Sequence, residues 1–197
     1  MLTLPTVEPA IPILESERLI LRGHRRDDFE DSAAMWRDTR VVRYISGKPS
    51  SSEEAWRRLL TYRGHWSLMG FGFWALIEKS SGRFVGEAGF SDFKREVEPS
   101  FDGAPEIGWV LAPWAHGQGF ATEAVRAAVA WGDAQFGAAR TLCMIHPDNR
   151  ASQRVATKCG YREFARASYG GNVQVVLERR AHGDALDRPA TPSRRRS

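Results

Sequence analysis

The alternation of apolar and polar positions is clearest in the middle of the chain. Residues Glu106–Leu111 (EIGWVL) combine β-branched, aromatic and aliphatic side chains and are soon followed by Pro113, which predicts a strand. A glycine-bearing turn at 116–121 (HGQGFA) comes next. After it the apolar residues keep the i, i+3, i+4, i+7, i+8 spacing of one helix face, at Ala121, Ala124, Val125, Ala128 and Val129. This spacing predicts a long helix that runs to about Phe136.

Strands and helices are expected along most of the remaining chain. We predict strands at 18–22, 71–78, 83–90, 141–145, 161–166 and 172–180, and helices at 29–37, 52–67 and 151–158. The strands at 71–78 and 83–90 flank a turn and should form an antiparallel hairpin. The strand at 141–145 should lie parallel to Glu106–Leu111, because a helix connects the two. Ser52 is expected to cap the helix at 52–67, and Gly160 to end the helix at 151–158.

Length and composition indicate one globular domain. The chain has 197 residues, of which 42% are hydrophobic and 26% charged. We expect a proline-spaced lead-in at 1–12, a single domain at 13–180 and a disordered basic tail at 181–197. The tail holds four Arg and two Asp, so it supplies +2 of the formal net charge of +4. The nearly balanced body argues against a nucleic-acid-binding face.

The cysteines, the histidines and the N-terminus indicate the cellular compartment and whether a metal or a membrane is involved. Cys143 and Cys159 have no CxxC partner, so we interpret them as core residues in a reducing compartment. Five scattered His give no metal-ligand spacing, and no metal is expected. The prolines at 5, 9 and 12 break the N-terminal stretch, which also lacks a basic region, so we do not expect a signal peptide. No apolar run approaches the length of a membrane span. A cytoplasmic protein without a membrane partner is predicted.

The turn at 116–121 has a definite chemical use. Glycines leave backbone N–H groups uncovered, and the first N–H groups of the following helix have no partner within it. A phosphate can therefore bind there. An ordinary strand-to-helix turn is the alternative. No Lys follows Gly119 as a Walker loop requires, and Thr122 stands where a dinucleotide fingerprint has its third Gly. An ATP- or NAD-binding protein that uses the same helix end stays open.

These residues resemble a known family. The turn resembles the acyl-CoA-binding motif [QR]-x-x-G-x-[GA] of the GNAT N-acetyltransferases, with His116 where Gln or Arg is usual. The flanking EIGWVL and GQGFATEA resemble the ribosomal-protein N-terminal acetyltransferase (RimJ/RimL-like) branch. The resemblance implies an α/β fold, with a mixed twisted sheet and helices on both faces, and acetyl-CoA as acetyl donor. It implies that the turn amides hold the CoA pyrophosphate and that the preceding strand pairs with the pantetheine arm. The implied CoA-binding residues in these two segments are Trp109, Val110, Leu111, His116, Gly117, Gln118, Gly119, Phe120 and Ala121.

A second segment, HPDNRASQRVATKCGY, resembles the NxxS…KxGF stretch of the same family. By itself Asn149 is best interpreted as a helix N-cap. The resemblance implies that Asn149 contacts the pantetheine arm and that Ser152 lies near the CoA sulfur. Many members place a Tyr seven residues after this Asn to protonate the departing thiolate, but here Ala156 occupies that position. Ser152 is the substitute that we predict.

The reaction that the resemblance implies needs a base, because a protonated amine cannot attack a thioester. Glu106 and Glu87 are acidic residues in otherwise apolar strands, and we rank Glu106 first. Either of them could instead face solvent. His146 is a third candidate, although a turn histidine more often bonds the backbone. Four Trp in the first half could line an acceptor pocket, but large aromatics are more often core residues.

The expected function is transfer of an acetyl group from acetyl-CoA to a primary amine, by direct attack. The acceptor is a protein N-terminus or a small-molecule amine, and the enzyme a monomer or homodimer. We expect the amide of Val110 to donate to the thioester carbonyl. The alternative is a non-catalytic CoA-binding sensor or partner module, which the missing Tyr at position 156 favours.

Overall fold

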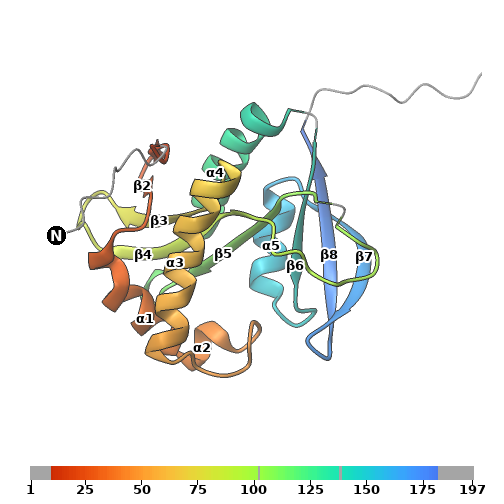
Figure 1. Cartoon of the computed structure of the whole chain (residues 1–197), viewed down its shortest axis with the longest axis horizontal. Helices are drawn as coiled ribbons and strands as arrows, with labels where there is room; N and C mark the ends of the chain where they lie inside the picture. Colours follow the sequence, from red (N-terminus) through yellow and green to blue (C-terminus); the bar gives the residue numbers. More distant parts are fainter. Residues whose placement is uncertain (1–9, 102, 138, 182–197) are drawn as a thin grey trace, which may run out of the picture.

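The computed structural model describes residues 10–101, 103–137 and 139–181 (Figure 1). The strands are β1 (Leu14–Glu15), β2 (Leu19–Arg22), β3 (Phe73–Glu78), β4 (Phe84–Ser91), β5 (Glu106–Leu111), β6 (Arg140–Ile145), β7 (Arg162–Tyr169) and β8 (Asn172–Arg180). The α-helices are α1 (Phe29–Arg37), α2 (Thr39–Val42), α3 (Ser52–Met69), α4 (Phe120–Phe136) and α5 (Arg150–Lys158), and short 3-10 helices form at η1 (Arg26–Asp28) and η2 (Pro113–Ala115). Most of the predicted lead-in and nearly all of the predicted tail lie outside the described residues.

The strands of the described residues form one mixed sheet of eight strands in the order β1-β2-β3-β4-β5-β6-β8-β7. The β3–β4 pair is the predicted antiparallel hairpin. The β5–β6 pair is parallel, as the connecting helix α4 requires. The other neighbouring pairs are antiparallel.

Helices cover both faces of the sheet, which confirms the expected architecture. On one face, residues of α1 and α2 pack with Ala75, Phe84 and Ala112. Figure 1 shows α3 crossing this near face. On the other face, the apolar stripe of α4 packs with Trp74, Ala88 and other strand residues in the largest core cluster. The helix spacing seen in the sequence is therefore the buried stripe of α4.

Several predicted boundaries need correction. Helix α3 is capped by Ser51 and not by Ser52: the Ser51 hydroxyl accepts from the Glu54 amide, and the Glu54 carboxylate accepts from the Ser51 amide. This reciprocal pair is a capping box, which three adjacent serines made hard to place. Strand β7 runs to Tyr169, beyond the predicted end at 166. Strand β1 and helix α2 were missed because two and four residues are too short to show a period.

The predicted core residues are mostly where they were expected. Cys143 and Cys159 are both buried. Trp66 and Trp74 pack edge-to-face on each other and on Trp131, so they belong to the core. No described helix is long and apolar enough to cross a membrane.

Candidate active site

Strands β5 and β6 diverge, and the site is built around this gap. Strand β5 is paired along its whole length with β4, from Glu106 opposite Ser91 to Leu111 opposite Gly86. On its other side β5 has a single register partner, Leu142 of β6 opposite Glu106. The edge of β5 beyond Ile107 is therefore open toward β6.

The direction of the β5 amides follows from the bonds at its two ends. The carbonyl of Pro105 accepts from the amide of Leu142 at 3.0 Å, and the amide of Ala112 donates to the carbonyl of Val85 at 2.8 Å. Backbone groups of successive strand residues point to opposite sides. The amides of Ile107, Trp109 and Leu111 therefore turn toward β6. That of Ile107 belongs to the bridge with Leu142, which leaves those of Trp109 and Leu111 facing the gap.

This alternation corrects the expected role of Val110. Its amide points to β4 and cannot polarise a carbonyl that lies in the gap. The amide of Ile107 is engaged in the β5–β6 bridge, so the amide of Trp109, which lines the cavity described next, is the available donor. The sequence could not decide between odd and even positions because the strand pairing sets the direction.

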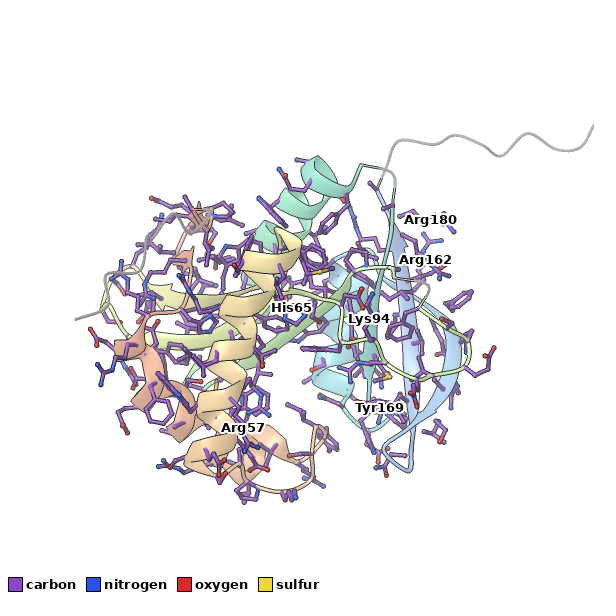
Figure 2. The ribbon with its side chains drawn as sticks, in the orientation of Figure 1. Arg57, His65, Lys94, Arg162, Tyr169 and Arg180 are labelled. Carbon is purple, nitrogen blue, oxygen red and sulfur yellow. The ribbon has the colours of Figure 1, made fainter. Side chains whose placement is uncertain are left out.

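A cavity of about 590 Å³ passes through this gap. Its walls come from α3 and the α1–α2 region on one face of the sheet, from β5 and β6, and from the start of α5 on the other face. In Figure 2, Arg57 of α3 and Tyr169 of β7, which both line it, lie on opposite sides of the region between α3 and α5. The predicted site residues in its lining are Glu106, Trp109, Val110, His146, Asn149 and Ser152.

The turn at 116–121 lies outside this cavity lining, at the N-terminus of α4. Gly117 and Gly119 have φ values of 76° and 85°, a left-handed conformation that favours glycine. Gly119 is the N-cap of α4 and brings no capping side chain. The His116 ring bonds the carbonyl of Leu111 at 2.9 Å through Nε2, which ties the turn to the end of β5. The turn thus presents helix N–H groups next to the open edge of β5.

Arg18 was not predicted to touch this turn. Its guanidinium donates to the carbonyl of Gln118 at 3.0 Å, forms an ion pair with Glu123 and lies 4.4 Å from the ring centre of Phe120. These contacts hold the turn against β2 and α4. They join residues about a hundred positions apart, so no local pattern could have found them.

Asn149 and Ser152 lie together at the start of α5. The Oδ1 atom of Asn149 accepts from the Ser152 amide at 3.2 Å, so the N-cap interpretation is confirmed. Both residues also line the cavity, as the resemblance implied. Ala156 is fully buried in the core and does not line the cavity. A tyrosine at that position would have to enter the core packing.

Glu106 is a cavity residue held by one partner. Glu106 as a whole is 8% exposed. Its carboxylate forms a bidentate pair with Arg95, accepting from Nε at 2.6 Å and from Nη2 at 3.1 Å. Burial alone would lower the pKa of the Arg95 guanidinium, but the Glu106 carboxylate outweighs it and raises that pKa. No local pattern pointed to Arg95, which lies in the loop after β4.

Glu87 is buried behind the cavity and does not line it. Its oxygens accept from the Ser32 hydroxyl at 2.7 Å and from the Trp36 indole at 3.0 Å, and Nε2 of His24 lies 3.5 Å away. Burial acts to raise the pKa of Glu87, but the His24 ring and the two donated bonds outweigh it and hold that pKa below its usual value. In this geometry Glu87 cannot contact an acceptor amine in the cavity directly.

His146 lies in the turn after β6 and stacks at a tilt on Tyr44, with ring centres 5.3 Å apart. Its Nδ1 accepts from the Asp148 amide at 3.1 Å. The Nδ1 lone pair is thus directed at a backbone amide and not into the cavity. This is the backbone-bonding alternative that the sequence allowed. Among the residues described, no group of three or more His, Cys, Asp or Glu could hold a metal ion.

Comparison with known proteins identifies the family. Residues 18–162 match the model of an acetyltransferase (GNAT) domain. The chain belongs to the GNAT family. It is 28% identical over 153 residues to YoaA of Bacillus subtilis (strain 168), named an uncharacterized N-acetyltransferase. The aligned region covers 77% of this chain and 84% of YoaA. A solved GnaT-family structure from Bordetella pertussis shares 32% identity at a TM-score of 0.76, over 85% of this chain and 99% of that one. The GNAT chain described here is thus an acetyl-CoA-dependent acetyltransferase.

More distant structures share the fold alone. RimL, described as a ribosomal L7/L12 alpha-N-protein acetyltransferase in complex with coenzyme A, has a TM-score of 0.70 at 17% identity, over 86% of this chain and 98% of that one. Aminoglycoside acetyltransferase AAC(6')-Ib, also in complex with coenzyme A, has a TM-score of 0.68 at 16% identity, over 83% of this chain and 95% of that one. Coenzyme A binding is therefore established in this fold, while these two likenesses assign no acceptor.

Proposed function

We propose that this GNAT enzyme transfers the acetyl group of acetyl-CoA to a primary amine that enters the cavity from the α3 side. The observation that carries the proposal is the open edge of β5, which leads from the N-terminus of α4 into a cavity that passes through the sheet. Unpaired strand amides suit the amide groups of a pantetheine arm, and a helix N-terminus suits a pyrophosphate. The proposed CoA-binding residues remain those named above, with the Val110 amide excluded as a donor.

Three cavity residues, Trp109, Glu106 and Ser152, have proposed parts in the reaction. The Trp109 amide donates to the thioester carbonyl as its oxygen becomes negative. Glu106 takes the proton from the acceptor amine, using the lone pairs that Arg95 leaves free. The amine nitrogen forms a bond to the carbonyl carbon, and the carbon–sulfur bond then breaks. The Ser152 hydroxyl donates to the departing thiolate.

The acceptor is proposed to be a peptide N-terminus or a small-molecule amine. Both kinds are represented by the names of proteins that share this fold. The ribosomal-protein branch, a cytoplasmic location, the oligomeric state and the absence of nucleic-acid and membrane partners stay predictions.

The function is tested by mixing the full chain with acetyl-CoA and a panel of primary amines and short peptides, and by following free thiol release together with the mass of the acetylated amine. We expect thiol release that depends on the amine and matches the acetylated product in amount. Binding of acetyl-CoA without any acetylated product would contradict the proposal and would favour a sensor or partner module.

A further inference from the structure

Among the described residues, one arginine in the cavity wall has no carboxylate within ion-pair distance. Arg58 of α3 lines the cavity and is half-buried. Among the described residues, its guanidinium makes one polar contact, from a terminal nitrogen to the Ser50 hydroxyl at 3.5 Å, which is the limit of a hydrogen bond. No described carboxylate lies within ion-pair distance of it. The other two cavity arginines are paired, Arg57 with Glu53 and Arg95 with Glu106. Arg58 is therefore the unpaired cation of the described cavity lining.

Glu54, the acidic residue nearest in sequence, acts on Arg58 only through its charge at longer range and forms no ion pair with it. Glu54 stands one helical turn earlier, at the i, i+4 spacing that often gives an ion pair. Its Oε2 instead accepts from the Ser51 amide at 2.7 Å, as part of the capping box of α3. The helix cap thus holds the carboxylate that would otherwise compete for Arg58.

The guanidinium of Arg58 is fixed in orientation. Its central carbon lies 3.7 Å from the ring centre of Trp36, which is 4% exposed. The Trp36 indole is itself held from behind by the buried Glu87 carboxylate at 3.0 Å. Stacking on an aromatic face leaves the N–H groups at the edge of the guanidinium free to donate. A planar fork of donors, held in place and unpaired, is suited to a carboxylate.

We propose that Arg58 binds a carboxylate of the acetyl acceptor, so that the acceptor is a primary amine that carries a carboxylate. This inference rests on the proposed function. The amine would approach the thioester at the open edge of β5, while the carboxylate would lie against α3, across the same cavity. The carboxylate has two chemical sources, the α-carboxylate of a free amino acid or an acidic side chain of a peptide.

Matched acceptors separate these sources. The first pair is Ser-Glu-Ala-amide and Ser-Gln-Ala-amide, which differ in one side-chain charge. The second pair is L-serine and L-serinamide, with each rate referred to the concentration of unprotonated amine. In at least one pair we expect kcat/KM for the acidic member to exceed that of its amide by about tenfold to a hundredfold, as for a charge-assisted hydrogen bond.

The variants assign this preference to Arg58. Arg58→Gln should reduce the acid-to-amide ratio to within about threefold of unity, mainly through KM for the acidic acceptor. Arg58→Lys keeps the charge but loses the fork and the stacking, so it should retain only part of the ratio. Arg57→Gln removes a neighbouring charge that is already paired with Glu53, so this variant should keep most of the acid-to-amide ratio. Thermal melting of each variant checks that it is folded.

Two results would overturn the assignment of Arg58: a wild-type ratio near unity in both pairs, or a preference that survives Arg58→Gln. The proposed function is tested separately, because amines that are acetylated without any acid preference refute only the inference. If no acceptor is turned over, the inference about Arg58 is tested by calorimetric binding of the same four compounds in the presence of CoA. Equal binding of acid and amide, or no binding of either, would then refute it.

Discussion

Individual acidic residues of this enzyme differ mainly in the partners that surround them. Glu106 and Glu87 occupy similar apolar strands in the sequence, and both were candidates for the base. In the structure Glu106 lines the cavity with Arg95 on its carboxylate, whereas Glu87 is sealed behind Trp36. Since a base must reach the proton that it takes, only Glu106 of this pair stays a proposed catalytic residue.

The proton-transfer role of Glu106 predicts a specific pH profile. Glu106→Gln should lower the acetylation rate by about a hundredfold or more below the pKa of the acceptor amine, and the loss should shrink at higher pH, where neutral amine is abundant. Glu54→Gln is the matched control, since Glu54 also lines the cavity but is engaged in the helix cap. An equal loss at every pH would mean that Glu106 only holds Arg95 in place.

The proposed role of Ser152 predicts that its replacement lowers kcat. Because its hydroxyl is proposed to support the leaving thiolate, Ser152→Ala should reduce kcat by about tenfold to a thousandfold with little change in acetyl-CoA affinity. The loss should be smaller for an acetyl thioester of a more acidic thiol. Thr157→Ala, on the exposed side of the same helix, is the control. Steady-state rates that match the parent would leave Ser152 as an ordinary helix residue.

At the scale of elements, the strand-turn-helix unit from β5 to α4 combines two kinds of unpaired backbone groups. The strand contributes amides on its open edge, because β6 diverges after one paired residue. The helix contributes N–H groups at its N-terminus, next to the left-handed Gly119. The link from His116 to the Leu111 carbonyl keeps the two ends adjacent.

This unit predicts the effect of charge at Gly119. Gly119→Asp should weaken acetyl-CoA binding at least tenfold, about 1.4 kcal/mol, because its carboxylate would lie near the bound pyrophosphate. Gly119→Asn has nearly the same shape and tolerates the same backbone conformation, so it separates charge from geometry. Calorimetric titration with acetyl-CoA measures both. Equal affinities for the two folded variants would refute a pyrophosphate at this turn.

At the scale of the whole molecule, a buried polar cluster joins the first helix to the middle of the sheet. Glu87 of β4 accepts from Ser32 and Trp36 of α1, and His24 lies beside it. Burial and then the Glu87 charge raise the pKa of Tyr62 well above its usual value, so the Tyr62 hydroxyl stays protonated. The same cluster supports Trp36 under Arg58. Stability and the proposed acceptor binding therefore share these residues.

The lowered pKa of Glu87 predicts a pH-dependent contribution to stability. A carboxyl whose folded pKa lies below its unfolded value of 4.5 stabilises the fold above that pH, and this contribution is lost as the pH falls through the folded pKa. Glu87→Gln should therefore reduce the free energy of unfolding by about 3 kcal/mol at pH 7, and by less below pH 4.5.

Urea unfolding at several pH values measures this difference. Glu30→Gln, which changes an exposed carboxylate of α1, should alter the free energy of unfolding by no more than about 0.5 kcal/mol. A gap between Glu87→Gln and the parent that stays constant from pH 7 to pH 4 would show that the Glu87 charge is not what stabilises the cluster.

The sequence by itself determined the elements and the glycine-bearing turn at 116–121, because these depend on short-range periodicity and on backbone freedom at particular glycines. The stripe of α4, the strand β5, the hairpin β3–β4 and the N-cap at Asn149 all follow from residues within a few positions of one another. The resemblance of two local motifs also identified the family.

Tertiary structure decided which of these groups face the cavity and which partners they meet. The direction of the β5 amides depends on pairing with β4, and the ion pair of Glu106 depends on Arg95. The orientation of the Arg58 guanidinium depends on Trp36, and the cap of α3 holds Glu54 away from it. Burial likewise separates Glu87 from Glu106 and puts Ala156 in the core. These relations join side chains through strand register, helix packing and electrostatics, which act between residues distant in the chain and leave no periodic trace in it.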